Sequence, residues 1–133
     1  MKKILVVDDE DDIRRFLELV LREKGYEALS AGGGEEGLQQ ARSLRPDLVL
    51  LDIMMPGLDG WQVLERLKAD PATTEIPVAI LSARTETKDP AYWRDKGAVA
   101  YVTKPFSLQT LFAKLHEILA AVGEQAKAGA SEA

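Results

Sequence analysis

The stretch Leu48-Val49-Leu50-Leu51-Asp52 sets four apolar residues directly before a carboxylate. A short continuous apolar run of this kind is typical of a strand that is buried on both faces of a parallel sheet. Three further strand-like runs also stop at polar side chains: Ile4–Val7 before Asp8 and Asp9, Val78–Leu81 before Ser82, and Tyr101–Thr103 before Lys104. Because open α/β sheets bind ligands beyond the carboxyl ends of their strands, we expect these polar groups to meet at one site.

The segments between these runs have the spacing and the end signals of helices. Apolar residues recur every three or four positions from Ile13 to Leu21, and Gly25 follows. The other predicted helices cover 35–44, 61–68, Asp89-Pro90 to Gly97, and the segment after Ser107, and a weaker strand is predicted over Tyr26–Ala31. Five strands therefore alternate with five helices. This pattern predicts an α/β fold with a doubly wound, five-stranded parallel sheet and helices on both faces.

Composition narrows the classes of function. The 133 residues suit one domain, and the absence of cysteine excludes thiol catalysis, zinc-thiolate sites and a disulfide framework. The formal net charge of −5 argues against direct binding of nucleic acid, which relies on clustered cations. The acids from Asp8 to Asp12 interrupt the first apolar run, so no export signal or membrane span is expected. We therefore expect a cytoplasmic protein.

The last residues differ in composition from the rest. Residues 123–133 are Ala, Gly, Ser, Glu, Lys and Gln without an apolar period, which predicts a disordered tail. Such a tail is either a natural end or a truncated linker. The folded domain is expected to occupy residues 1–122.

Four short motifs lie at the ends of the predicted strands. They are Val7-Asp8-Asp9-Glu10, Leu51-Asp52-Ile53-Met54-Met55-Pro56-Gly57-Leu58-Asp59-Gly60, Leu81-Ser82-Ala83 and Tyr101-Val102-Thr103-Lys104-Pro105-Phe106. Their order and spacing over residues 3–122 closely resemble the receiver domain of two-component response regulators, including the chemotaxis regulators. The resemblance implies a flavodoxin-like strand order, 2-1-3-4-5.

The resemblance also implies roles for individual residues. Asp52 is expected to accept a phosphoryl group from a histidine kinase or a histidine phosphotransfer protein. Ser82 and Lys104 are expected to contact the phosphoryl oxygens, and Tyr101 to change rotamer on activation. The implied magnesium ligands are Asp9 and Asp52 directly, Asp8 through water, and Met54 through its backbone carbonyl. The Lys104-Pro105 peptide bond is expected to be cis.

The chemistry explains why these residue types are needed. Neighbouring carboxylates repel one another, and Mg²⁺ offsets the repulsion because it is a hard cation that prefers oxygen ligands. A carboxylate can accept a phosphoryl group covalently, and the transfer depends on positioning and charge stabilisation. Met54 cannot hydrogen-bond an attacking water, and Arg84 is long enough to cover the phosphoryl group. We therefore expect slow self-hydrolysis.

The implied function is that of a signalling switch rather than an enzyme. Phosphorylation of Asp52 is expected to alter the affinity of an output surface for a downstream protein or domain. By resemblance, this surface includes Tyr92, Trp93, Tyr101 and the last helix. The cognate kinase and the oligomeric state are left open by the sequence.

Three alternatives remain at this point. The first is a receiver-like module that binds partners without being phosphorylated, and the second is a small magnesium-dependent phosphohydrolase. The third is a dinucleotide site, because Gly32-Gly33-Gly34-Glu35-Glu36-Gly37 spells G-x-G-x-x-G with Asp52 twenty residues after Gly32. For Glu10, Asp11 and Asp12, the acids nearest the first helix, we expect only helix capping and charge complementarity.

Overall fold

The computed structural model describes residues 1–83 and 89–132, with side chains up to residue 121. Within this part of the chain lie five strands: β1 (Lys3–Val7), β2 (Glu27–Ala31), β3 (Leu48–Asp52), β4 (Val78–Ser82) and β5 (Ala100–Thr103). All neighbouring pairs are parallel, in the order β2-β1-β3-β4-β5. The predicted doubly wound sheet and its 2-1-3-4-5 order are therefore confirmed. Strand order reverses beside β1, so the carboxyl ends of β1 and β3 border the crevice where such folds bind ligands.

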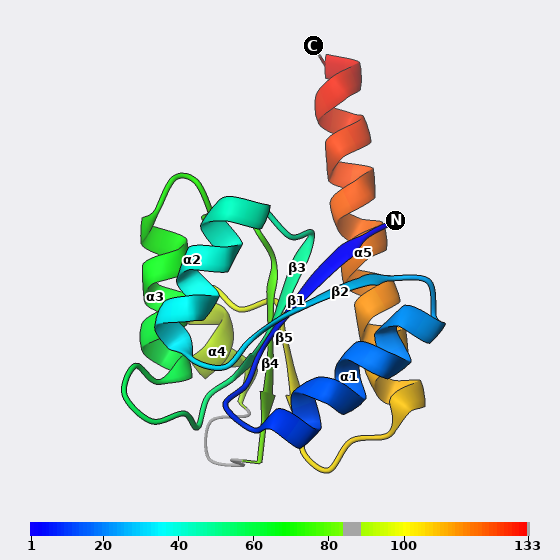
Figure 1. The fold of residues 1–133 in the computed structure, drawn as a ribbon. Helices are drawn as coiled ribbons and strands as arrows, with labels where there is room; N and C mark the ends of the chain where they lie inside the picture. The colour runs from blue at the N-terminus through cyan, green and yellow to red at the C-terminus, as the bar shows by residue number, and fades with distance from the viewer. Residues whose placement is uncertain (84–88, 133) are drawn as a thin grey trace.

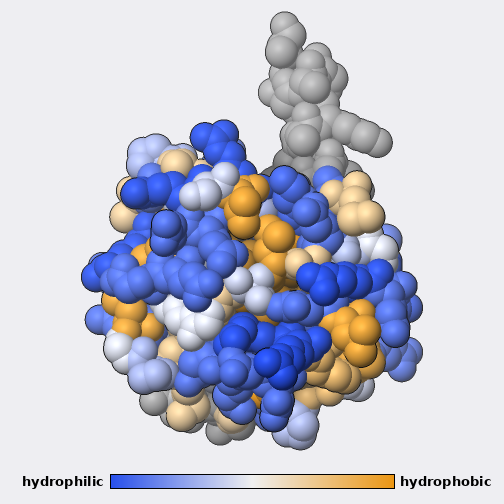
Figure 2. All heavy atoms as spheres, in the orientation of Figure 1, coloured by the Kyte–Doolittle hydropathy of each residue, from blue (hydrophilic) through white to orange (hydrophobic). Residues whose placement is uncertain are grey.

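The helices cover both faces of the sheet. The described residues form α1 (Asp11–Glu23), α2 (Gly34–Leu44), α3 (Gly60–Ala69), α4 (Pro90–Asp95) and α5 (Leu108–Glu132). Figure 1 shows α2, α3 and α4 on one side of the sheet and α1 and α5 on the other. Most of the surface visible in Figure 2 is hydrophilic, and scattered hydrophobic residues lie among the hydrophilic ones. This is the expected surface of helices that pack one apolar face against the sheet.

Two apolar layers result from the alternation of side chains along each strand. In β1, Ile4 and Val6 pack with α1 and α5, in what we call the α1/α5 layer. Leu5 and Val7 face the opposite way and pack in the α2–α4 layer, which contains Trp93. All four of these side chains are buried. This burial fixes the register of β1, because a slip by one residue would exchange the two layers.

Helix α5 is longer than the sequence analysis predicts. A disordered tail is expected over residues 123–133, whereas the helix continues to Glu132 (Figure 1). Ala, Glu, Gln and Lys are good helix formers, so the segment can extend a helix that has already begun without an apolar stripe of its own. Neither α5 nor any other described helix is long and apolar enough to cross a membrane.

The G-x-G-x-x-G segment serves packing between elements. It follows β2, the edge strand of the sheet, and leads into α2 rather than following the strand beside the switch point. A Cβ added at Gly37 would lie 2.9 Å from Cγ1 of Val7, so glycine allows α2 to approach β1. The segment therefore lacks the position that a dinucleotide fingerprint requires, and that alternative is not supported.

The start of α3 lies directly against the end of β3. The Gly60 N–H donates to the Ile53 carbonyl at 2.9 Å, and a Cβ at Gly60 would lie 2.4 Å from the Asp52 carbonyl oxygen. A side chain is thus excluded at Gly60. Asp59 caps the helix: its carboxylate accepts from the Gln62 N–H at 3.0 Å, and the Gln62 side chain accepts from the Asp59 N–H at 2.9 Å.

Replacing Asp59 with Ala is expected to destabilise the protein by about 1 kcal/mol, because it removes the carboxylate that accepts from the Gln62 N–H at the start of α3. Urea unfolding followed by circular dichroism measures the change. Asp89→Ala is a useful comparison, since Asp89 caps the much shorter α4 by accepting from the Ala91 N–H. An unchanged unfolding midpoint for Asp59→Ala would contradict a stabilising role for the cap.

Candidate functional site

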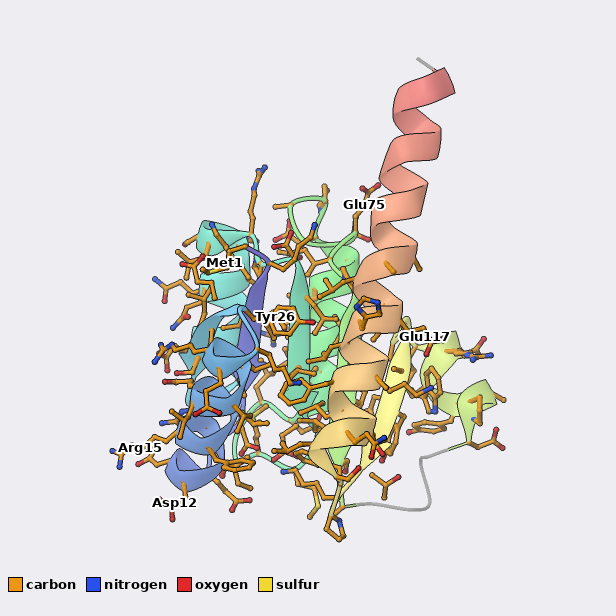
Figure 3. The ribbon with its side chains drawn as sticks, turned by 90° about the vertical axis from the view of Figure 1, so that its right-hand side faces the viewer. Met1, Asp12, Arg15, Tyr26, Glu75 and Glu117 are labelled. Carbon is orange, nitrogen blue, oxygen red and sulfur yellow. The ribbon has the colours of Figure 1, made fainter. Side chains whose placement is uncertain are left out.

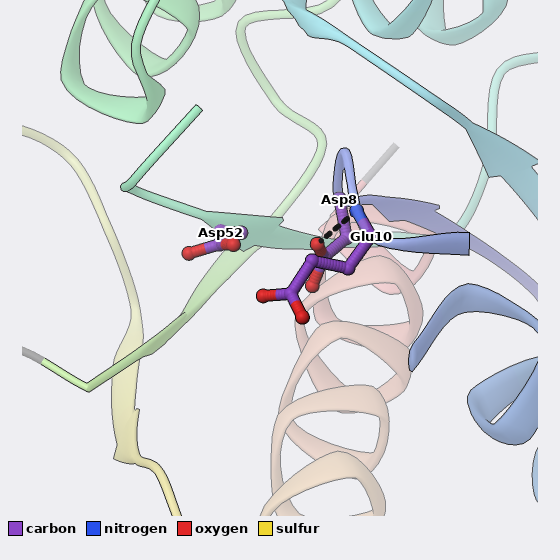
Figure 4. A group of neighbouring side chains, drawn as sticks. All are labelled: Asp8, Glu10 and Asp52. Carbon is purple, nitrogen blue, oxygen red and sulfur yellow. Dashed lines mark hydrogen bonds between the residues drawn. The ribbon is translucent and has the colours of Figure 1, made fainter. Parts of the chain in front are cut away.

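Carboxylates from two neighbouring strand ends lie together at the switch point. Oxygens of Asp8, Glu10 and Asp52 all lie within 4.8 Å of one another. Asp8 directly follows β1, and Asp52 is the last residue of β3. Both are buried, with exposed fractions of 1% for Asp8 and 5% for Asp52. Figure 4 shows the carboxylates of Asp8 and Glu10 on the side of the loop that faces Asp52. The predicted convergence of Asp8 and Asp52 is therefore present in the fold.

Glu10 is a member of this group that the sequence analysis assigns to helix capping. Glu10 is indeed the N-cap residue of α1, but its side chain makes no capping hydrogen bond there. Instead the Glu10 N–H donates to Oδ1 of Asp8 at 2.9 Å, a turn that brings the Glu10 carboxylate back towards Asp8 (Figure 4). An Asp in a loop is a general sequence signal for such a turn, because its side chain can accept from the backbone N–H two residues on. Asp9, between them, is partly buried, and its charge acts on Asp52.

In the described part of the chain, Lys104 is the cation that pairs with both Asp8 and Asp52. Its Nζ lies 3.3 Å from Oδ2 of Asp8 and 3.6 Å from Oδ2 of Asp52, and the lysine side chain is 16% exposed. The Lys104 N–H donates to the Ser82 carbonyl at 2.8 Å, which joins the ends of β5 and β4. The Lys104-Pro105 bond is cis, as the resemblance implies. One ammonium group thus bridges two buried carboxylates.

The remaining predicted residues lie on the strands, or directly after the strands, that border this centre. Ser82 is fully buried at the carboxyl end of β4, where it pairs in register with Thr103 of β5. Tyr101 is half-buried and stacks on Trp93, with ring centroids 6.5 Å apart. The Met54 N–H donates to Oδ1 of Asp52 at 3.1 Å, while the Met54 side chain is exposed. Arg84 lies outside the described residues.

The environment of Asp52 favours its protonated form. The pKa of Asp52 is raised from 3.8 to about 6; burial is the main cause, and the negative charges of Asp8 and Asp9 contribute to the rise. The Lys104 ammonium and the hydrogen bond from Met54 oppose it without cancelling it. The site therefore has more negative charge than its own cation compensates. Clustered carboxylate oxygens with unbalanced negative charge are the donor set that fits a hard divalent cation.

This raised pKa predicts an unusual pH dependence. Between about pH 4 and pH 6 the folded protein binds a proton at Asp52 that the unfolded chain releases, so the free energy of unfolding falls as pH rises through this window. A shift from 3.8 to about 6 corresponds to a destabilisation on the order of 2–3 kcal/mol above pH 6 without metal. Asp52→Asn is therefore expected to stabilise the metal-free protein by about 2 kcal/mol at about pH 8.

Urea unfolding in EDTA at about pH 5 and about pH 8 measures this effect. The control is Asp12→Asn, since Asp12 points outward from α1 in Figure 3 and is exposed. If Asp52→Asn were no more stable than the wild type at the higher pH, the carboxylate would not carry the inferred penalty.

Comparison with known proteins agrees with the geometry. Residues 4–116 match the family model of the response regulator receiver domain. Transcriptional regulatory protein AfsQ1 of Streptomyces coelicolor is 38% identical over 119 residues, which cover 90% of this chain and 52% of AfsQ1. Alkaline phosphatase synthesis transcriptional regulatory protein PhoP of Bacillus subtilis is 41% identical over 118 residues, which cover 89% of this chain and 48% of PhoP. The chain thus spans about half the length of these curated relatives.

A solved structure extends the likeness to three dimensions. Chemotaxis protein CheY4 of Vibrio cholerae has a TM-score of 0.82 and 29% sequence identity, with 89% of this chain and 98% of that chain covered. The family match spans the acids after β1, Asp52 after the apolar part of β3, Ser82 and Lys104. The chain therefore belongs to the response regulator receiver domain family.

Proposed function

We propose that this chain is the phosphoryl-accepting switch of a two-component system, with Asp52 as the acceptor. The observation that carries the proposal is the position of Asp52: it is buried at the switch point, faces Asp8 and Glu10, and is bridged to Asp8 by Lys104. A buried carboxylate with one neighbouring ammonium and an excess of acids is costly for a structural role alone. The energetic cost of keeping Asp52 in this position supports a functional role for its carboxylate.

The donor is proposed to be a phosphohistidine of a histidine kinase or of a histidine phosphotransfer protein. An oxygen of Asp52 forms the new P–O bond while the P–N bond breaks, and the leaving imidazole nitrogen keeps the electron pair. Lys104 and the Ser82 hydroxyl would stabilise charge on the equatorial phosphoryl oxygens. In this sense the chain assists its own phosphorylation, and later its hydrolysis, without acting on a separate substrate.

Magnesium is the proposed cofactor. The residues that would hold it are Asp8, Asp9, Asp52 and the backbone carbonyl of Met54, and Glu10 adds negative charge beside them. When bound, the ion neutralises charge on the carboxylates and on the phosphoryl oxygens. The chain's own contribution is to keep these oxygens together in a buried position before the donor arrives.

The proposed output surface lies around α4, β5 and α5. Tyr101 stacks on Trp93 of α4, so a change of Tyr101 rotamer would disturb that contact. Tyr92 of α4 contacts Trp61 of α3 edge to face, with ring centroids 5.1 Å apart. Phosphorylation can shift this surface only by contacts that differ between two states, and Ser82 and Tyr101 are the proposed carriers of that difference.

The domain is also proposed to have a defined target and cellular compartment. We take residues 1–122 as the receiver unit and expect its target to be an output domain or a separate protein, in the cytoplasm. AfsQ1 is named a transcriptional regulatory protein. For this chain we propose signal transfer through a protein contact, with no direct contact to nucleic acid.

Intact mass after incubation with acetyl phosphate tests the function. Gain of one phosphoryl group in the presence of Mg²⁺, and none in EDTA, is the expected result. A folded protein that binds Mg²⁺ but gains no phosphoryl group would favour the phosphorylation-independent binding module. Sustained hydrolysis of an added phosphate ester would favour the phosphohydrolase.

A further inference from the structure

Arg14 connects the acidic loop to two other parts of the chain. It lies on the first turn of α1, with a side chain that is only 19% exposed. Nη1 donates to the Asp8 carbonyl oxygen at 2.8 Å, and Nη2 pairs with the Asp11 carboxylate. The guanidinium also lies against the loop after β2, because a Cβ added at Gly32 would be 3.3 Å from Nη1. A single side chain therefore spans the loops that follow β1 and β2.

The contact with Asp8 fixes the backbone from which the acids project. The Asp8 carbonyl belongs to the planar peptide unit that joins Asp8 to Asp9, so holding this oxygen orients the start of Asp9. The Asp8 N–H donates to the Ala31 carbonyl at 3.1 Å, and the Glu10 N–H donates to Oδ1 of Asp8 at 2.9 Å. Of these contacts, the one from Arg14 can be removed by changing a side chain outside the acidic group.

We propose that Arg14 is a positioning residue for the divalent-cation site. Carboxylates that crowd together repel one another, and the repulsion favours movement of the loop that carries Asp8, Asp9 and Glu10 away from Asp52. Arg14 opposes this movement by holding the Asp8 peptide from the side of α1. The inference rests on the cation site of the proposed function and adds a residue to it that does not touch the ion.

The direction in which Mg²⁺ affinity changes when Arg14 is replaced distinguishes a positioning role from a purely electrostatic one. Loss of a positive charge near an acidic site should by itself tighten Mg²⁺ binding, since an arginine repels the ion. Loss of an outer-shell contact weakens metal binding by about 10- to 100-fold in known sites. Arg14→Met is therefore expected to raise the Mg²⁺ dissociation constant at least about tenfold, against the direction that charge alone predicts.

Arg15→Met is the matched control. Arg15 neighbours Arg14 on α1, carries the same charge, is exposed, and points away from the domain in Figure 3. Its replacement removes one positive charge without removing a contact to Asp8. We expect Mg²⁺ binding to stay the same or to tighten by about twofold, because charges at the surface are screened by salt.

A second pair of variants leaves every charge in place. Gly32→Ala would set a methyl group against the Arg14 guanidinium, which must then move by a few tenths of an ångström. Gly33 is extended at φ −173°, and a Cβ there meets nothing within 4 Å, so Gly33→Ala is the control. We expect Gly32→Ala to weaken Mg²⁺ binding by about threefold or more, because it displaces the guanidinium that holds the Asp8 peptide. We expect Gly33→Ala to leave Mg²⁺ binding within about twofold of the wild type, because its methyl group displaces nothing.

The experiment is a Mg²⁺ titration of the full chain followed by backbone amide chemical shifts, with urea unfolding in EDTA to show that each variant is folded. Weaker binding in folded Arg14→Met and Gly32→Ala, with both controls near the wild type, supports the inference. Binding by folded Arg14→Met as tight as that of Arg15→Met overturns it, and so does wild-type binding in Gly32→Ala if Arg14→Met does not fold. Absence of Mg²⁺ binding in the wild type would overturn the proposed cation site as well, which distinguishes the two failures.

Discussion

Asp52→Asn is expected to gain no phosphoryl group from acetyl phosphate under conditions in which the wild type gains one. The carboxamide has nearly the same shape and can keep the buried position at the end of β3, but its oxygen is a poor nucleophile and it adds no negative charge. The expected change is complete loss of the mass increase. Intact-mass measurement with Mg²⁺ present reports it directly.

The matched control replaces an acid that lies outside the site. Asp12→Asn removes one carboxylate from the exposed face of α1, where Figure 3 shows it pointing into solvent. This variant is expected to be phosphorylated like the wild type. If Asp52→Asn still gained a phosphoryl group, the acceptor would have to be another side chain, and Asp8 and Asp9 would be the next candidates.

Lys104→Met is expected to lower the free energy of unfolding by about 3 kcal/mol at about pH 8 in EDTA. The methionine fills a similar volume but leaves the carboxylates of Asp8 and Asp52 without the ammonium that lies 3.3 and 3.6 Å from them. Removing one partner of a buried ion pair leaves a charge uncompensated, which costs more than a surface pair contributes. Urea unfolding followed by circular dichroism measures the difference.

The same variant has a pH signature. Near pH 5 most Asp52 side chains in the folded protein carry a proton, because the pKa is about 6 even with Lys104 present. The loss of stability in Lys104→Met should therefore shrink as pH falls, and Asp52→Asn in the same chain should restore part of it. Lys114→Met is the control, since the pair that Lys114 forms with Glu117 is exposed. Equal losses at both pH values, with no recovery in the double variant, would refute the electrostatic explanation.

The sequence predicts most of the fold because local signals agree with one another. The run from Leu48 to Leu51 is apolar throughout, is bounded by Pro46 and Asp52, and becomes a strand buried on both faces. Gly25 and Asp89-Pro90 mark helix ends where α1 stops and α4 begins. Periodicity does not predict the end of α5, where helix propensity rather than an apolar stripe continues the helix.

The site is predicted less completely, for a geometric reason. Asp8, Asp52 and Lys104 could be brought together from sequence because each ends or directly follows a strand of one parallel sheet. Glu10 and Arg14 lie in a loop and a first helical turn, where the backbone path decides which side chains turn inward. That path depends on hydrogen bonds such as the one from Arg14 to the Asp8 carbonyl, which no spacing in the sequence reveals. The direct ligand roles of Asp9 and Met54 stay predictions.

The uneven distribution of aromatic residues between the two layers has an optical consequence. The chain has two tryptophans, and both belong to the α2–α4 side: Trp93 lies in that layer and Trp61 packs against it. The α1/α5 layer holds Tyr26, Phe106 and Phe112 at its margin instead. Intrinsic tryptophan emission therefore reports on the α2–α4 side of the molecule. Loosening of α1 or α5 alone would change this emission very little. The substitution Phe112→Trp would add a fluorescent reporter to the α1/α5 layer.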